Sequence, residues 1–278
     1  MKQNVVKDLN TPELDIYIRE TEQQVRGKGL FIAESAYVAI CALEAGCRPV
    51  SVLVEKERLE AEGEPVFEAV SKYCSSGISD SLPVYIAERE IITNITGHHL
   101  VRGLWMALER PEPITADDFL RENRRIAILV DVLNPANVGA IFRSAAALGL
   151  DGMLLSHSSV DPLTRRTARV SMGTVFKMPW AQAALEDSEG MALLSLLRKH
   201  GYKTVAMALT EDSTSVDDEK IRSNEKVAVL LGTEGDGLPK DVIAASDYRV
   251  MIPMQRGVDS LNVAAASAVC FWELMKKK

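Results

Sequence analysis

The sequence predicts an α/β fold in which a parallel sheet carries helices on both faces and follows a small α/β domain. Residues 126–132 form a nearly continuous apolar run of strand length, as a strand buried on both faces requires. Helix and strand patterns alternate along the second half of the chain, which is typical of parallel sheets. A polar, proline-rich stretch separates that half from the first.

Composition sets the broad class of the protein. With 278 residues, of which 47% are hydrophobic and 26% charged, the chain can form one large domain or two smaller ones. These proportions exclude disorder as the main state. The longest apolar stretches fall far short of the roughly 20 residues that cross a bilayer. Residues 1–10 lack the apolar core of a signal peptide, so we expect a cytoplasmic protein without a membrane span.

The first region contains short helix and strand signals, which indicate a small α/β domain. A helical pattern begins at Phe31 and stops at Gly46. Residues 50–54 form a short β-branched run, and residues 83–86 are a second candidate strand.

A break in regular structure then divides the chain. Arg110-Pro111-Glu112-Pro113 interrupts both patterns, and the residues that follow are mostly polar. We therefore expect a small domain at residues 1–108, a linker at residues 109–123, and a second domain at residues 124–278.

The second region reads as a repeated strand and helix unit. Residues 125–132 predict a buried strand, and residues 138–148 predict a helix that Gly149 ends. Further strands are expected at residues 152–155, 204–208, 227–231 and 250–252, with helices at residues 191–200 and 264–275. Ligands of such sheets bind outside the carboxyl ends of the strands, so the loops there are the candidate site.

Net charge and cysteine spacing give weaker evidence about function than the strand and loop pattern does. The net charge of −7 argues mildly against a protein coated with nucleic acid, because phosphate binding draws on lysine and arginine. Basic residues nevertheless gather in two clusters. Each cluster is either a solvated, salt-bridged surface or part of a nucleic-acid path, and we hypothesise the second. The clusters are Arg121, Arg124 and Arg125, and Arg165, Arg166, Arg169 and Lys177. The four cysteines have no metal or redox spacing, so we expect buried or idle thiols and no metal.

The loop after the first buried strand carries two asparagines. Asn134 and Asn137 lie at a loop-to-helix junction, where each amide can cap a helix or bind a ligand. Arg143 lies in the alanine-rich helix that follows, among small and apolar neighbours. A cation there either extends to water or acts as a fixed clamp for a phosphate or carboxylate.

Two further strand ends are followed by unusual loops. Residues 232–239 hold three glycines, which allow sharp turns and close backbone approach to a ligand, without the P-loop or dinucleotide-loop pattern. Glu234 in this loop could pair with Arg143. After residue 252, a loop leads to Ser260-Leu261-Asn262 and an apolar helix, and Ser260 is well placed as the cap of that helix.

Taken together, these loops closely resemble the three signature motifs of the SpoU/TrmH family, which belongs to the SPOUT superfamily of RNA methyltransferases. The matching segments are Asn134-Pro135-Ala136-Asn137-Val138-Gly139-Ala140-Ile141-x-Arg143, Leu231-Gly232-Thr233-Glu234-Gly235-x-Gly237-Leu238, and Ile252-Pro253-Met254 with Ser260-Leu261-Asn262-Val263. They occur in the family's order and at its usual distance from the C-terminus. The resemblance covers most of residues 124–276 and extends faintly to residues 31–35, which resemble the start of the small RNA-binding domain of many members.

The resemblance implies an activity, a cofactor and an assembly. It implies transfer of the methyl group of S-adenosylmethionine to a ribose 2′-hydroxyl in ribosomal or transfer RNA. It also implies a homodimer and a C-terminal trefoil knot, which periodicity could not reveal because threaded chains are so rare. Neither a metal nor a membrane partner is implied.

The resemblance also implies site residues. It assigns the catalytic site to Asn134, Arg143, Glu234, Ser260 and Asn262. We interpret Arg143 as a clamp on phosphate and hydroxyl, because a free guanidinium is a very weak base. Glu234 is expected to orient Arg143, and Asn262 to hold the loop or the substrate, while the acceptor of the hydroxyl proton stays open.

The cofactor is implied to lie in the knot. Its adenine is expected against the backbone around Gly232, Ile252 and Leu261, with Thr233 and Gly237 as further cofactor-binding candidates.

One residue departs from the family pattern, and two other functions stay open. Many members have serine where this chain has Ala264, so a hydrogen bond that some relatives make is missing. Methylation of a base is the first alternative, since other SPOUT branches do this. An RNA-binding protein of ribosome assembly that has lost catalysis is the second, and the presence of Arg143, Glu234 and Asn262 speaks against it.

Overall fold

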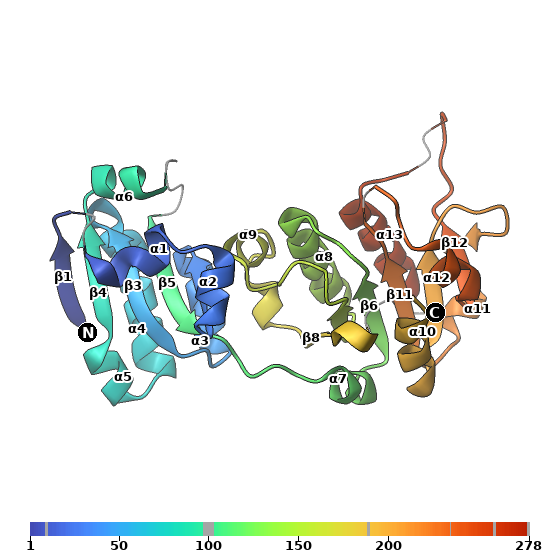
Figure 1. Cartoon of the computed structure of the whole chain (residues 1–278), viewed down its shortest axis with the longest axis horizontal. Coiled ribbons are helices and arrows are strands. Elements are labelled where there is room, and N and C mark those ends of the chain that lie inside the picture. Colours follow the sequence, from blue (N-terminus) through green and yellow to red (C-terminus); the bar gives the residue numbers. More distant parts are fainter. Residues whose placement is uncertain (9–10, 97–102, 188–189, 234, 258–259, 277–278) are drawn as a thin grey trace. The chain divides into compact units, whose positions relative to one another are not determined.

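The computed structural model describes the whole chain except residues 9–10, 97–102, 188–189, 234, 258–259 and 277–278 (Figure 1). It contains two compact units. The first comprises Met1–Glu112 together with Leu163–Lys177, and the second comprises Pro113–Pro162 and Met178–Lys278. The segment Leu163–Lys177 thus packs with the N-terminal unit, although the sequence suggests no break on either side of it.

The N-terminal unit is built on a five-stranded mixed sheet of order β1-β4-β3-β5-β2. β1, β4 and β3 run parallel, whereas β5 is antiparallel to both β3 and β2. The strands are β1 (Lys2–Val6), β2 (Leu30–Glu34), β3 (Pro49–Glu55), β4 (Pro83–Ala87) and β5 (Leu104–Glu109). The two strands expected from the sequence, at residues 50–54 and 83–86, are confirmed as β3 and β4.

Short helices cover this sheet. They are α1 (Asp15–Ile18), α2 (Glu22–Gly27), α3 (Ala36–Glu44), α4 (Glu64–Tyr73), α5 (Ser76–Ser81), α6 (Arg89–Thr96) and α9 (Arg165–Val170), with single turns at Pro12–Leu14, Lys56–Arg58, Leu59–Gly63 and Thr174–Phe176. Tyr17, Leu53 and Trp105 are among the buried residues of the core on one face of the sheet.

The predicted helix from Phe31 to Gly46 is wrong in its first part. Phe31 lies in β2, paired with Leu108 of β5, and the helix begins only at Ala36. Ser35 separates the two elements with a φ of 112°, and its hydroxyl accepts a hydrogen bond from the amide of Val38 as the helix cap. Only Glu34 and Ser35 separate the two apolar runs, which is too short a break to show where the strand ends and the helix begins.

The second basic cluster is largely used to hold Leu163–Lys177 on the N-terminal unit. The guanidinium of Arg165 lies 3.3 Å from a carboxylate oxygen of Glu22 and 5.2 Å from the ring centre of Trp105. Arg169 pairs with Glu34 at 2.5 Å. These two arginines therefore stabilise packing, which weakens the hypothesis that they line a nucleic-acid path.

The C-terminal unit is built on a seven-stranded sheet of order β10-β12-β9-β11-β6-β7-β8, in which every pair of neighbouring strands is parallel. The strands are β6 (Arg125–Leu129), β7 (Gly152–Leu155), β8 (Trp180–Gln182), β9 (Lys203–Met207), β10 (Thr214–Ser215), β11 (Val227–Leu231) and β12 (Tyr248–Met251). The parallel sheet expected from residues 126–132 is confirmed.

Helices lie on both faces of this sheet. They are α7 (Ala116–Glu122), α8 (Pro135–Leu148), α10 (Gly190–Lys199), α11 (Glu219–Arg222), α12 (Lys240–Ala245) and α13 (Val263–Met275), with one turn at Leu185–Asp187. Ile126 and Ile128 of β6 join a core with residues of α7, α10 and α12. Ala127 and Leu129, which alternate with them, are also buried, so both faces are covered. α8 and α13 pack against each other outside that core.

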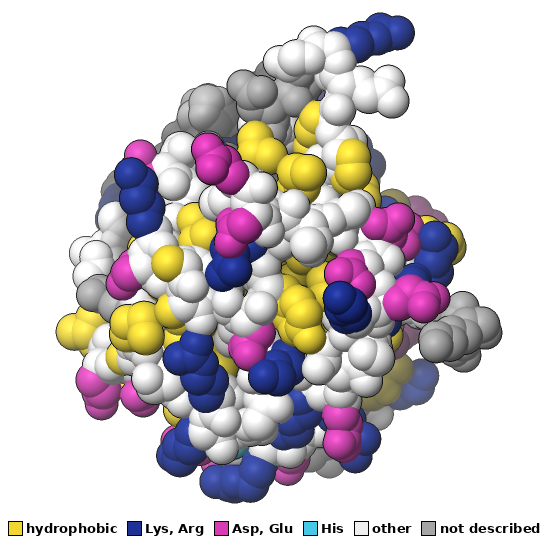
Figure 2. Space-filling view, turned by 90° about the vertical axis from the view of Figure 1, so that its right-hand side faces the viewer, with side chains coloured by type: hydrophobic (Ala, Val, Ile, Leu, Met, Phe, Trp, Pro, Cys, Tyr) yellow, Lys and Arg dark blue, Asp and Glu magenta, His cyan; other side chains and the backbone are white. Residues whose placement is uncertain are grey.

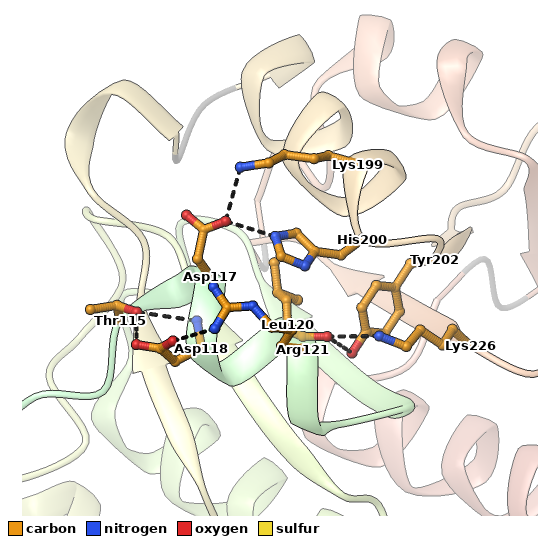
Figure 3. A network of polar contacts seen from close by, with 9 residues as sticks. All are labelled: Thr115, Asp117, Asp118, Leu120, Arg121, Lys199, His200, Tyr202 and Lys226. Atoms are coloured by element: carbon orange, nitrogen blue, oxygen red, sulfur yellow. Dashed lines mark hydrogen bonds and ion pairs between the residues drawn. The ribbon is translucent and has the colours of Figure 1, made fainter.

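The stretch expected to be a linker, residues 109–123, contains helix α7. Phe119 and Leu120 are its buried residues, and polar groups hold its C-terminal end (Figure 3). The Tyr202 hydroxyl donates to the Asn123 carbonyl at 2.6 Å, and the Lys226 ammonium donates to the Leu120 carbonyl at 2.9 Å. Two apolar residues were too few to reveal this helix in a polar sequence.

The first basic cluster also has partners within the C-terminal unit. Arg124 pairs with Glu225 at 3.1 Å. The Arg125 guanidinium donates to the Leu274 carbonyl at 2.8 Å and to the Arg222 carbonyl at 2.9 Å. Arg125 therefore ties the start of β6 to the end of α13.

The structure also bears on the predictions about cysteines, membrane spans and metal sites. All four cysteines are free thiols, and Cys41, Cys47 and Cys270 are buried, as expected. Within the described residues, no helix has the length and low charge that crossing a bilayer demands. The same part of the chain holds no cluster of three or more metal-binding side chains. The trefoil knot stays a prediction.

Candidate functional site

Three loops meet the condition for a ligand site in a parallel sheet. They follow β6, β11 and β12, whose carboxyl ends lie at the same edge of the sheet because all three strands are parallel. β11 pairs directly with β6, and one strand, β9, separates β11 from β12.

The first loop leads into α8 through a helix cap. Asn134 has extended backbone angles, and its side chain accepts a hydrogen bond from the amide of Ala136 at 2.9 Å. Pro135 follows at the first helical position, where a missing amide costs nothing. Asn134, expected to be catalytic, therefore uses its side-chain oxygen to begin the helix.

A hydrogen bond joins the first loop to the third. The side-chain amide of Asn262 donates to the side-chain oxygen of Asn137 at 3.2 Å, across 125 residues of sequence. Asn137 is only 8% exposed, in the first turn of α8. The motif resemblance pointed to Asn134 as the site residue, whereas the structure brings Asn137 to the third loop.

Asn262 has a second role, which the sequence pattern predicts for Ser260. Its side-chain oxygen accepts from the amide of Ala264 at 2.9 Å, so Asn262 is the cap of α13. The prediction that Ser260 caps this helix is wrong, because the helix begins two residues later. Ser260 is exposed at the end of the third loop.

Arg143 lies on α8 with an exposed side chain. It lies six positions after Asn137, which corresponds to about 9 Å along the helix axis. Within the described part of the chain, its guanidinium has no hydrogen bond or ion pair. Glu234, its expected partner, lies outside the described residues, and the pairing stays a prediction.

The second loop is closed by backbone contacts around Gly232. A Cβ built there would lie 2.3 Å from the carbonyl carbon of Gly237 and 2.5 Å from the amide nitrogen of Leu238. The Gly237 amide donates to the Thr233 carbonyl at 3.2 Å, and Gly237 has a φ of 70°. Gly232 is therefore required sterically, and Gly237 conformationally.

The remaining expected cofactor residues offer apolar surface at the same edge. Ile252 follows β12 and is half-buried, and Leu261 is 41% exposed beside Asn262. An exposed leucine next to loops rich in backbone donors and acceptors suits a flat, partly apolar base such as adenine. The residues present thus fit an adenosine-containing cofactor, and Gly232 allows the second loop to fold tightly on its own backbone.

The sequence of the C-terminal half also matches a known protein family. The model of the SpoU rRNA Methylase family matches residues 124–272, which is just over half of the chain. The match spans all three loops.

Individual relatives extend the similarity to both units. The chain is 36% identical to an uncharacterised tRNA/rRNA methyltransferase of Mycobacterium tuberculosis, over 89% of this chain and 81% of the relative. It is 27% identical to the 23S rRNA (guanosine(2553)-2′-O)-methyltransferase of Bacillus subtilis, over 77% of this chain and 86% of that protein. The fold is also similar to an AdoMet-bound rRNA methyltransferase from Sinorhizobium meliloti, with a TM-score of 0.79, 24% identity, and 98% and 97% of the two chains covered.

Proposed function

The chain belongs to the SpoU rRNA methylase family of RNA methyltransferases, and on that premise we propose that it transfers the methyl group of S-adenosylmethionine to a ribose 2′-hydroxyl of ribosomal or transfer RNA. The relative in Bacillus subtilis, which carries 2′-O-methyltransferase in its name, supports the choice of a ribose oxygen. The observation that carries the proposal is the hydrogen bond between Asn137 and Asn262, because it joins the first and third loops at the ligand-binding edge of the sheet.

The reaction needs alignment and charge stabilisation. When bound, S-adenosylmethionine supplies an electrophilic methyl group attached to a positively charged sulfur. The residues of this chain must hold the ribose oxygen in line with that group and stabilise the negative charge that grows on the oxygen as its proton leaves. An oxygen–carbon bond forms and the carbon–sulfur bond breaks. The hydroxyl proton passes to a base, which we do not assign to a residue.

Arg143 is the residue we propose for this stabilisation. Its exposed, permanently charged guanidinium can bind the phosphate next to the target ribose and donate to the developing alkoxide. In the proposal, Glu234 orients Arg143, and Ser260 and Asn262 hold the third loop against the substrate. Asn137 joins the site residues as the partner of Asn262.

We assign the cofactor to the second and third loops. Backbone groups of Gly232, Thr233 and Gly237 would bind the polar edges of adenosine, and Ile252 and Leu261 would pack on its base. The bridge between Thr233 and Gly237 supports this assignment, because it fixes the backbone before any ligand arrives.

The N-terminal unit, which includes Leu163–Lys177, is proposed to bind RNA, and we propose that the protein is cytoplasmic. A homodimer with a knotted C-terminal domain completes the proposal. Trp272 on α13 is 57% exposed and Val269, three residues earlier on the same helix, is 38% exposed, which suits burial against a second copy. Figure 2 shows the C-terminal unit, with apolar side chains gathered in patches between charged ones.

Replacing Arg143 tests the proposal. Arg143→Ala should abolish transfer of labelled methyl from S-adenosylmethionine to a mixture of unmodified ribosomal and transfer RNA transcripts, while calorimetry shows nearly unchanged cofactor affinity. Arg198→Ala is the control, because Arg198 is an exposed arginine at the end of α10, just before the amino end of β9. Near-normal turnover by Arg143→Ala would remove this residue from the mechanism.

A further inference from the structure

The chain turns sharply between β6 and the first loop, at Asp131. The amide of Val130 still donates to the Leu231 carbonyl of β11 at 2.9 Å, so sheet pairing continues up to this point. Asp131 then adopts a φ of 55°, a left-handed conformation that residues other than glycine seldom adopt. Only two residues separate Asp131 from Asn134, the cap of α8. The direction in which α8 starts therefore depends on this turn.

The Asp131 turn is held by serines from the loop after β7. The Ser156 hydroxyl accepts from the Asp131 amide at 2.9 Å and lies 3.0 Å from the carboxylate oxygen Oδ1, to which it donates. The Ser158 hydroxyl donates to the same oxygen. Hydrogen bonds to a charged acceptor are stronger than neutral ones, so the carboxylate is the centre of this contact.

A second set of hydrogen bonds fixes the serine loop itself. The Ser159 hydroxyl accepts from the Val132 amide at 3.2 Å and donates to the Leu129 carbonyl at 3.0 Å. From β8, the Gln182 side-chain amide donates to the His157 carbonyl at 2.9 Å. The turn at Asp131 thus rests on a loop that is anchored to the sheet.

We infer that Asp131 is a positioning residue for methyl transfer, which acts by fixing the start of α8 and with it Asn137 and Arg143. This inference rests on the proposed function. Arg143 is on the helix that this turn starts, and a displacement of about 1 Å of a reacting group can cost on the order of a hundredfold in rate. A carboxylate that only stabilised the fold would change unfolding without changing the rate of the folded enzyme.

The chain offers a matched control at the other end of the same strand. Asp151 accepts from the amides of Arg124 at 3.0 Å and Arg125 at 2.7 Å, at the amino end of β6, whereas the first loop follows its carboxyl end. Asparagine in place of either aspartate keeps the shape of the side chain and removes its charge. Asp131→Asn and Asp151→Asn therefore differ mainly in the end of β6 that loses its charged acceptor.

The test compares single-turnover methyl transfer by the full-length chain, using labelled S-adenosylmethionine and unmodified ribosomal and transfer RNA transcripts. We expect Asp131→Asn to lower the single-turnover rate at least tenfold, with cofactor Kd within twofold of the parent, and Asp151→Asn to keep the parental rate. Equal rates for the two folded variants would overturn the inference. If the parent chain itself transfers no methyl group, the proposed function fails instead.

Ser158→Ala decides the matter if Asp131→Asn does not fold. The Ser158 side chain is exposed, so its removal leaves the core intact while one donor to Asp131 is lost. A rate lowered several-fold with an unchanged melting temperature supports positioning. A parental rate contradicts it.

Discussion

Replacement of Gly232 by alanine tests the second loop at its tightest point. The new Cβ would lie 2.3 Å from the carbonyl carbon of Gly237, whereas ordinary contacts of a Cβ begin near 3.4 Å. The atoms in the way belong to backbone, so no side-chain rotation relieves the clash. The backbone of Gly237 and Leu238 must therefore move by about 1 Å.

The expected magnitudes follow from that displacement. Overpacking of this kind costs about 1–3 kcal/mol, which lowers the Tm of a domain of this size by roughly 3–10 °C. If the backbone of this loop binds the cofactor, a shift of about 1 Å breaks its hydrogen bonds, and affinity for S-adenosylmethionine should fall at least tenfold.

Gly235→Ala is the matched control in the same loop. A Cβ at Gly235 meets no atom within 4 Å, and its φ is not in the left-handed region. Both variants share the small stabilisation of about 0.4–1 kcal/mol that comes from a less flexible unfolded chain. Titration calorimetry and thermal melting of both variants are compared. Cofactor affinities that agree within twofold would refute the assignment of this loop to the cofactor.

Three further predictions concern other parts of the C-terminal unit. A double-mutant cycle of Asn137→Ala and Asn262→Ala, read by urea unfolding, should show a coupling of about 0.5–1.5 kcal/mol, and strictly additive losses would mean that the hydrogen bond does not form. Trp272→Asp should convert a dimer to a monomer in sedimentation, and an unchanged dimer would exclude the exposed face of α13 as the dimer interface. Hydrogen bonds from Lys199 and His200 lower the pKa of Asp117 from its ordinary 3.8, so its stabilisation is complete above the unfolded value and is lost as the pH falls through the folded one. Below about pH 4, Asp117→Asn should therefore lose less stability than the parent chain, and parallel curves of urea midpoint against pH would contradict this.

The strands of the C-terminal sheet were predictable because burial on both faces leaves a simple pattern. Residues 227–231 were expected as a strand and form β11 with those bounds, and the helix ended by Gly149 is confirmed as α8. By contrast, β1 is an edge strand in which only Val6 is buried, so no apolar pattern marks it. β10 has two residues, too few for any periodicity.

The sequence predicted which three loops form the site, but it did not predict which of their side chains contact one another. The three loops were identified from the motif resemblance, yet which asparagine meets the third loop depends on helix phase. The resemblance pointed to Asn134, whereas Asn137 makes the contact. Ser260 and Asn262 differ as caps only through where α13 begins, a boundary that composition does not fix. Asp131 carried no sequence signal, because its role comes from serines that the fold brings beside it.

The position of the transferred methyl group decides whether the chain methylates a ribose oxygen. RNA transcripts labelled with S-adenosylmethionine by the parent chain are cleaved with alkali and resolved at single-nucleotide resolution. A ribose 2′-O-methyl group blocks cleavage at one linkage, so we expect a single gap in the ladder that is absent with Arg143→Ala. Labelled RNA with an unbroken ladder would place the methyl group on a base and contradict the account.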